Sequence, residues 1–251
     1  MKKKNKLISF LAPVVSFLLI FSLWEIACTV NEVPTWFLPK PTEIFRSMVV
    51  DFPEFWPHIL VTFEVVLMGF LIAIPVGLLL ASLVTSFPLV NAALSPYITF
   101  LVTTPLISLI PLLMLMMGFG LNMRITTVVI QSFAVINMNA CTGFNNVPTI
   151  RRELMQSMGA DPIKTYLKMT LPSAASDIFT GVRLAAIFAT TTCISVEYNA
   201  GNTGLGSQII KYSQYLKTTQ SFACIFYVTI IGLIMYGLIS FAQKKIISWK
   251  E

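Results

Sequence analysis

The chain has 251 residues, of which 56% are hydrophobic and 11% charged, with a mean hydropathy of +0.79 and a formal net charge of +6. A chain this apolar and this poor in charge is not a water-soluble globular domain. Its positive charge fits basic residues gathered on one side of a membrane and in contact with anionic lipid, so a nucleic-acid partner is not needed to explain it.

Long apolar runs predict six membrane-spanning helices, because about 20 such residues are needed to cross a bilayer. We expect them at about Leu7–Cys28, Ile59–Val84, Ala92–Met117, Arg124–Gly143, Ala174–Glu197 and Phe222–Gln243. The first span follows a basic stretch, as in a secretory signal peptide. However, its apolar part is longer than in such peptides and no Ala-x-Ala cleavage site follows, so we expect a retained membrane helix.

Proline shapes two regions of the chain. Asn31–Pro57 is rich in proline and in aromatic residues suited to the headgroup region, and the residues after Thr42 suggest a short amphipathic helix on the membrane surface. Pro53 and Pro57 are expected to break the chain before the second span. The third span is expected to be kinked, because three prolines interrupt it: Pro96, Pro105 and Pro111.

Basic residues predict the orientation, since Lys and Arg beside short loops stay in the cytoplasm. The side of the N-terminus carries Lys2, Lys3, Lys4, Lys6, Arg151, Arg152, Lys164, Lys168, Lys244, Lys245 and Lys250, with Arg183 nearer to it than to the other side. The opposite side has Lys40, Arg46, Arg124, Lys211 and Lys217. Both termini and the loop between the fourth and fifth spans are therefore expected in the cytoplasm.

That loop, about residues 145–172, has the local chemistry of two short helices. Pro148 can open the first and Gly159 can end it in the left-handed conformation. Asp161 followed by Pro162 gives an N-cap and a first-turn proline for the second. An apolar knob among basic residues is expected on one face of the first helix, formed by Leu154, Met155 and Met158.

The spacing of Glu153, Gly159 and the pair Leu171-Pro172 resembles the cytoplasmic signature loop of ABC importer permeases. The family's loop begins Glu-Ala-Ala, whereas Leu154 and Met155 stand at the two alanines here. The resemblance implies that this loop, with Ala160 and Asp161, docks into a groove of an ATPase subunit. The alternative is an ordinary solvated connection whose amphipathic helix lies on the membrane surface.

Further motifs resemble the branch of these permeases that imports nitrate, sulfonates, taurine and thiamine precursors. In chain order they include Trp24-Glu25, Leu38-Pro39-x-Pro41, Gly69-Phe70, Gly118-Phe119-Gly120, Gly181-x-Arg183-Leu184 and Gly204-Leu205-Gly206. Two positions depart from the pattern: Glu64 stands where the family usually has a basic residue, and Ser108 where alanine is commoner.

The resemblance implies an all-α polytopic membrane protein of about six helices with type I ABC importer permease (MetI-like) architecture. Residues 1–251 would form one permease domain with a core at about 59–243, in the bacterial inner membrane. It implies a second permease copy, two cytoplasmic ATPase subunits that hold ATP and Mg, and an external binding protein that delivers a small polar solute.

Polar side chains inside the spans are candidates for the solute path. Hydroxyls gather in the fifth span at Thr190, Thr191, Thr192 and Ser195, with Glu197 close to its end. They line a pathway, or bond back to their own helix and pack against another. Glu25, Glu64 and Glu197 line an outer entrance in the functional reading, or serve as interfacial and helix-to-helix contacts in the other.

Several chemistries find no support in the sequence. The four cysteines form no CxxC pair and the single histidine is His58, so a disulfide framework or a metal site is not expected. Gly201–Gly206 lacks the strand and the Lys-Ser/Thr ending of a phosphate-binding loop, so the chain is expected not to hydrolyse ATP.

Two other classes of protein remain as alternatives. A self-sufficient secondary transporter or channel, coupled through membrane carboxylates, predicts internal repeats and charges near mid-bilayer. The sequence has no evident repeat, and its carboxylates lie near the span ends. An integral membrane enzyme would need a cluster of catalytic residues, which the sequence does not offer.

Overall fold

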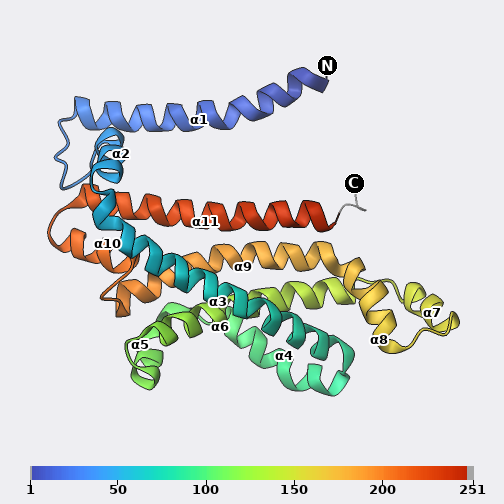
Figure 1. Cartoon of the computed structure of the whole chain (residues 1–251). Helices are drawn as coiled ribbons and strands as arrows, with labels where there is room; N and C mark the ends of the chain where they lie inside the picture. The colour runs from blue at the N-terminus through green and yellow to red at the C-terminus, as the bar shows by residue number, and fades with distance from the viewer. Residues whose placement is uncertain (1, 248–251) are drawn as a thin grey trace.

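The computed structural model describes residues 2–247, with the backbone alone for residues 2–10. The regular secondary structure of this range is helical: α1 (Lys2–Val30), α2 (Pro41–Val50), α3 (Phe52–Ser86), α4 (Pro88–Thr103), α5 (Leu106–Met117), α6 (Leu121–Asn145), α7 (Thr149–Ser157), α8 (Pro162–Thr165), the π-helical turn η1 (Tyr166–Thr170), α9 (Leu171–Ala200), α10 (Leu205–Gln214) and α11 (Thr218–Ile246). The expected all-α architecture is confirmed (Figure 1).

Helices α3, α6 and α9 form the core, with α6 between the other two. Glycines let the backbones approach closely, as is common between membrane helices. A Cβ atom at Gly69 would lie 2.6 Å from Cγ1 of Val128, and one at Gly181 would lie 2.6 Å from Cβ of Asn139. The positions of these glycines therefore set the spacing of the three helices.

The helix termini gather at two opposite ends of the molecule. The first turn of α1, the last turn of α11 and the pair α7–α8 lie at one end, whereas α2 and α10 lie at the other (Figure 1). This arrangement agrees with the expectation that loop 145–172 shares a side with both chain termini.

Five of the six expected spans are single helices. In the described part of the chain, α1, α3, α6, α9 and α11 are each long and apolar enough to cross a membrane. The third expected span is not one kinked helix, and this prediction was wrong. It is divided between Thr103 and Leu106 into α4 and α5, which are bent by 104°.

The break lies at Pro105 because that residue lacks an N–H group and forces its predecessor out of helical conformation. Thr104 has ψ 128°, and Pro105 itself is extended with ψ 100°. Pro96 and Pro111, in contrast, remain inside α4 and α5. The three prolines are thus not equivalent, although nothing in their local sequence distinguishes them.

The prediction that Pro53 and Pro57 break the chain was also wrong, since α3 begins at Phe52 and includes both. Pro53 falls in the first turn, where a missing N–H removes no helical hydrogen bond. The short helix expected before it is present as α2. The carboxylate of Glu25, in α1, stabilises the first turn of α2 by accepting hydrogen bonds from the backbone N–H and the hydroxyl of Thr42, at 3.1 and 2.8 Å.

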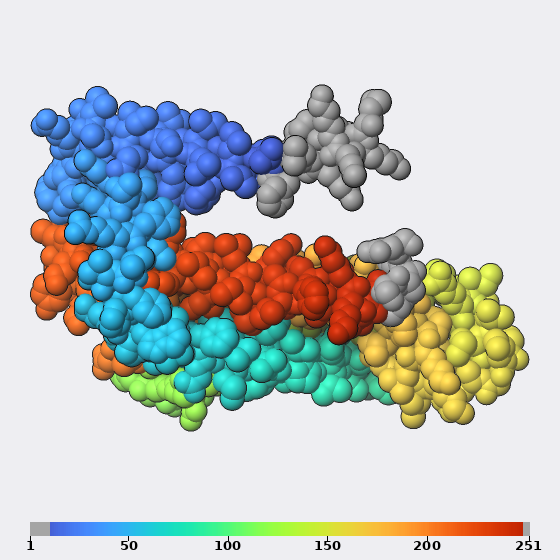
Figure 2. All heavy atoms as spheres, turned by 45° about the horizontal axis from the view of Figure 1, so that its top comes forward, coloured from blue at the N-terminus to red at the C-terminus, as the bar shows by residue number. Residues whose placement is uncertain are grey.

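Among the side chains of α1 that the structure describes, from Leu11 onward, contacts with the remainder of the molecule lie in the C-terminal half of the helix. Phe21 and Trp24 pack against Phe45 of α2 and against Phe222 and Phe226 of α11, with ring centroids 5.9–6.0 Å apart. Away from this aromatic cluster, α1 stands apart from α11 (Figure 2). Most of its apolar side chains are exposed, Leu23 by 65% and Ile20 by 62%.

Candidate functional site

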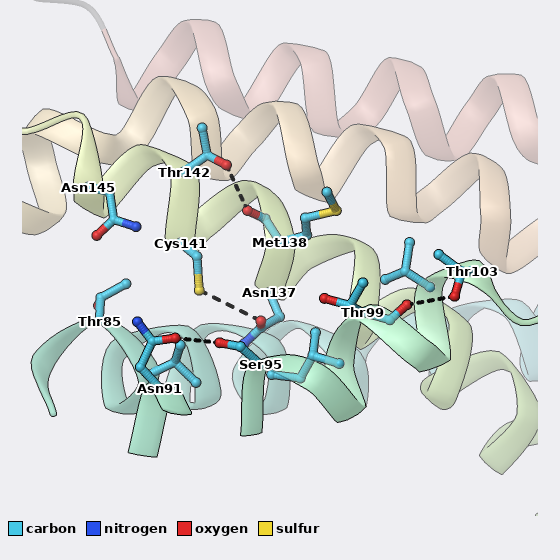
Figure 3. Close-up of a pocket in the computed structure, with 13 residues that line it drawn as sticks. Thr85, Asn91, Ser95, Thr99, Thr103, Asn137, Met138, Cys141, Thr142 and Asn145 are labelled. Atoms are coloured by element: carbon cyan, nitrogen blue, oxygen red, sulfur yellow. Dashed lines mark hydrogen bonds between the residues drawn. The ribbon is translucent and has the colours of Figure 1, made fainter. Parts of the chain in front are cut away.

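A cavity of about 280 Å³, whose mainly apolar surface is interrupted by polar side chains, lies between α4 and α6, beside the C-terminal end of α3 (Figure 3). Helix α4 contributes one row of polar residues at intervals of four: Asn91, Ser95, Thr99 and Thr103. This spacing places them on a single helical face. Helix α6 supplies the facing wall, which includes Asn137, Met138, Cys141, Thr142 and Asn145.

Most hydroxyl groups in this cavity donate their proton to their own helix. Thr103 donates to the carbonyl of Thr99 at 3.0 Å, and Thr142 to the carbonyl of Met138 at 3.0 Å. Their oxygen lone pairs remain free to accept hydrogen bonds. Asn and Thr side chains line the cavity together with apolar ones, and no charged residue does. The cavity can therefore bind water or a small polar solute without an ion pair.

A second cavity, of about 450 Å³, lies at the break between α4 and α5. Its polar lining consists of Thr103, Thr104, Gln131, Thr191, Thr192 and Ser195. Val102 and Thr103 line both cavities, so the two adjoin at the end of α4. Together they form a track along one side of α6, called the polar track below because polar side chains recur along its mainly apolar wall.

The hydroxyls expected in the fifth span divide between two faces of α9. Thr191, Thr192 and Ser195 line the cavity at the break, whereas Thr190 is 5% exposed and lies toward Gly232 of α11. Thr191 and Ser195 also bond back to their own helix, to the carbonyls of Phe188 and Thr191 at 3.1 and 3.0 Å. Lining a cavity and back-bonding are thus not alternatives.

Glu197 lies outside both cavities, fully buried beneath the first turn of α10. Its carboxylate accepts hydrogen bonds from the Thr62 hydroxyl at 3.0 and 2.9 Å and from the Gly206 N–H at 2.9 Å. Gly204 crosses it with φ +103°, and a Cβ atom there would lie 2.3 Å from the carboxylate. The geometry makes Glu197 a brace between α3, α9 and α10 rather than a wall of the track.

The sequence analysis did not identify Gln131, Thr103 and Thr104 as residues that line the cavity at the break between α4 and α5. A signal for the α4 row was present, because Asn91, Ser95, Thr99 and Thr103 recur every four residues in an apolar run. It could not show which helix lies opposite.

At the other end of α10, Tyr212 donates a hydrogen bond from its hydroxyl to Glu54 Oε1 of α3 at 2.7 Å. Burial is the larger cause and this hydrogen bond the second of a pKa of Tyr212 well above its ordinary value.

Among the described residues, no group of His, Cys, Asp and Glu side chains is arranged to hold a metal ion.

The loop between α6 and α9 is organised by helix caps. The N–H of Gly159 donates to the carbonyl of Gln156 at 2.9 Å, and that of Ala160 to the carbonyl of Met155 at 3.0 Å. With φ +74° at Gly159 these bonds form a Schellman C-cap, as the sequence predicted. Pro148 is the N-cap of α7 rather than its first residue.

The second short helix of the loop also begins as expected. The side chain of Asp161 accepts a hydrogen bond from the Lys164 N–H at 2.6 Å and so caps α8, with Pro162 in its first turn. After one π-helical turn, the chain enters α9 at Leu171, and Pro172 lies in the first turn of that helix. The loop is therefore continuous with the core.

An apolar stripe runs along the outer face of α7. Ile150, Leu154 and Met158 recur every four residues and are 71%, 61% and 74% exposed. Met155, expected in this knob, is half-buried against the loop, and Ile150 takes its place. Glu153 is exposed beside the stripe.

The family model described as "Binding-protein-dependent transport system inner membrane component" matches residues 73–248. The chain belongs to this family of inner-membrane permeases, whose members are subunits of ABC importers and work with a separate ATPase subunit and a binding protein.

Curated relatives align over almost the whole chain. It is 25% identical to the formylaminopyrimidine transport permease protein ThiX of Halalkalibacterium halodurans, over 96% of each chain. It is 23% identical to the taurine transport system permease protein TauC of Escherichia coli, over 92% of this chain and 86% of that protein. It is 22% identical to the nitrate import permease protein NrtB of Leptolyngbya laminosa, over 93% and 86%.

Solved structures share the fold. A crystal structure of an amino acid ABC transporter with histidines matches with a TM-score of 0.66 and 19% identity, over 80% of this chain and 98% of that one. An inward-facing MetNI methionine ABC transporter matches with a TM-score of 0.54 and 24% identity, over 77% and 92%. The architecture is therefore that of MetI-like permeases, as expected.

Proposed function

We propose that two copies of this chain form the membrane part of an ATP-driven importer, with the polar track of each copy facing the other across the path. The observation that carries this proposal is the polar track itself, in which uncharged polar side chains recur across the break between α4 and α5. One copy supplies only an open, one-sided groove, and a two-fold partner would close it.

Thr191, Thr192 and Ser195 are the residues of α9 that we assign to the path, together with Gln131 of α6. Glu197 is assigned to the support of α9 instead, because it is buried away from both cavities. Hydroxyl and amide groups replace part of the hydration shell of a polar solute without holding it tightly, which suits a path that must release its cargo.

The loop between α6 and α9 is the proposed contact with the ATPase. The exposed stripe of Ile150, Leu154 and Met158 has the form of a helix face that docks into a groove. ATP and Mg would be bound by that ATPase, which lies in the cytoplasm. Both chain termini would then be cytoplasmic too, since the ends of α1 and α11 lie on the side of this loop (Figure 1).

The opposite end of the molecule, formed by α2 and α10, would receive the solute from an external binding protein. The solute would be small and polar, of the kinds named for the relatives: nitrate, a sulfonate such as taurine, or a thiamine precursor such as formylaminopyrimidine. Aromatic residues at this end, such as Trp36 and Trp56, would contact lipid headgroups.

The test is reconstitution in liposomes. The chain alone should neither hydrolyse ATP nor accumulate solute under a proton or sodium gradient. Addition of its ATPase and binding protein should give ATP-dependent uptake, which a mutation in the nucleotide site of the ATPase should abolish. Gradient-driven accumulation by the chain alone would contradict the proposal and favour a secondary transporter.

A further inference from the structure

A third cavity, of about 400 Å³, lies beneath the loop on the inner side of α7. It is enclosed by α7, by α8 with η1, and by the C-terminal end of α3. Its polar lining consists of Thr85, Ser86, Arg152, Gln156, Thr165, Tyr166 and Thr170. The two cavities of the polar track lie between α4, α6 and α9, and the first of them shares only Thr85 with this one. The remaining lining belongs to the end of α3 and to the loop between α6 and α9, so the solute path does not explain this cavity.

Helix α7 separates this cavity from the exposed apolar stripe. Arg152 lies two residues, about 200°, from Ile150 and from Leu154, so it is on the opposite helical face. Gln156 follows Arg152 by four residues and shares its face. One side of α7 is thus the apolar stripe, and the other is a polar wall that carries a cation.

The positive charge of Arg152 has no counterpart in this part of the molecule. One terminal nitrogen of its guanidinium donates to the carbonyl of Phe144 at 2.9 Å. Its Nε is buried without a hydrogen-bond partner, no carboxylate lines the cavity, and Arg152 forms no ion pair among the residues described. A buried donor without an acceptor is unfavourable and calls for a ligand or water.

Thr165 provides an independent second observation on the facing wall. Its side chain is 8% exposed and lines the same cavity, and its hydroxyl is likewise buried without a partner. Two residues, one cationic and one neutral, therefore line a space of ligand size, and each carries a buried donor without a partner.

The backbone beside them is unusual in the same place. Tyr166 and Thr170, at the two ends of the π-helical turn η1, line the cavity, and such turns are frequent at functional sites. The Tyr166 hydroxyl is hydrogen-bonded to Ser82 of α3, so the turn is held against α3. The cavity is therefore built by fixed elements on two sides and by α7 on the third.

We propose that this cavity binds an oxyanion of the phosphate type, with Arg152 and Thr165 as its donors. Guanidinium groups pair with phosphate oxygens through charge-assisted hydrogen bonds, and a hydroxyl adds a further donor. A bound anion would fix α7 against α3. Only its consequence for coupling to an ATPase rests on the proposed function, because binding itself needs no partner protein.

The experiment uses the full chain, purified in maltoside micelles free of phospholipid, with inorganic phosphate as the probe at constant ionic strength. Titration calorimetry and the thermal midpoint should show saturable binding. Arg152→Gln should weaken the affinity at least tenfold and Thr165→Val severalfold. The matched control is Arg151→Gln on the adjacent, exposed arginine, which contacts Ser173 and not the cavity; its affinity should stay within twofold.

A second arm replaces phosphate by a short-chain phosphatidylglycerol. Competition between the two probes, with the same dependence on Arg152 and Thr165, would identify a lipid headgroup as a source of the oxyanion. Thr165→Val leaves the hydrogen bond from Arg152 to the carbonyl of Phe144 in place, so the affinity of this variant tests the proposal even if Arg152→Gln does not fold. Absence of saturable binding of both probes, or binding that neither variant weakens, would overturn the proposal. Neither result depends on whether the chain transports a solute.

Discussion

The hydroxyl of Thr62 on α3 lies between Glu197 of α9 and the first turn of α10. It donates to the two carboxylate oxygens of Glu197, at 3.0 and 2.9 Å, and accepts a hydrogen bond from the Leu205 N–H at 2.8 Å. Thr62 and Glu197 are fully buried. One side chain thus fixes the relative position of three helices at one end of the molecule.

Replacing Thr62 by valine keeps the shape of the side chain and removes this contact. The Leu205 N–H and the Glu197 carboxylate would each lose a partner in a buried place, so we expect unfolding to become easier by about 2–4 kcal/mol. Thr229→Val is the matched control, since that exposed hydroxyl bonds only to its own helix. Thermal unfolding of the purified variants measures both, and equal midpoints would contradict the bracing role.

Gly204 should tolerate no side chain. Its φ of +103° is unfavourable for alanine, and the added Cβ would meet the Glu197 carboxylate at 2.3 Å. We expect Gly204→Ala to cost about 2–4 kcal/mol of stability. Gly237→Ala, in the middle of α11 with no atom within 4 Å of the new Cβ, should be neutral or stabilising by about 0.5–1 kcal/mol. A Gly204→Ala variant as stable as the parent would show that this turn can relax.

Leu154→Asp should weaken the association with the ATPase without disturbing the fold. The side chain is 61% exposed in the free chain, and loss of its burial in a groove is worth about 2 kcal/mol, or roughly 30-fold in affinity. Co-purification and stimulated ATPase activity are the measurements. Val49→Asp places the same charge on an exposed apolar site of α2, at the other end, and should leave co-purification with the ATPase unchanged.

Ser195→Trp should block the path. The new ring would enter the 450 Å³ cavity at the break between α4 and α5, so ATP-dependent uptake should fall at least tenfold while the complex with the ATPase still assembles. Leu238→Trp places the same ring on an exposed face of α11 and should transport normally. Undiminished uptake by Ser195→Trp would remove this cavity from the path.

Single cysteines in a cysteine-free background test the orientation. Ser157 in α7 and Ser213 in α10 are both exposed and lie at opposite ends of the molecule. An impermeant maleimide should label Ser213→Cys in intact cells and Ser157→Cys only after the membrane is opened. Labelling of Ser157→Cys from outside would place the loop between α6 and α9 on the wrong side for a cytoplasmic ATPase.

Local chemistry made parts of the loop predictable from the sequence. The left-handed conformation of Gly159 and the N-cap of Asp161 depend on residues within three or four positions, so no tertiary contact had to be known. The long apolar runs predicted five spans for the same reason, because a bilayer imposes a minimum length.

Contacts between distant segments were beyond such reasoning. Pro96, Pro105 and Pro111 look alike in sequence, yet only Pro105 separates two helices, since the neighbours of each decide whether the freed backbone groups can be satisfied. For Glu197 the sequence alone leaves both an outer entrance and a helix-to-helix contact open, because charge in a membrane is often functional but also pairs between helices. Its partner Thr62 lies 135 residues away, and only the fold brings them together.

From Pro162 to Ala200, α8, η1 and α9 form one uninterrupted run of 39 residues. Thr191 lies 25 residues beyond Tyr166, which corresponds to about 37 Å of helix. A hydrogen-bonded helix resists twisting far more than a loop does. A rotation of α8 is therefore transmitted along the helix to the cavity wall that carries Thr191 and Ser195, while the contacts of Glu197 hold the C-terminal end of α9 in place. The whole run is therefore a single element that resists twisting, and its N-terminal end lies beside α7.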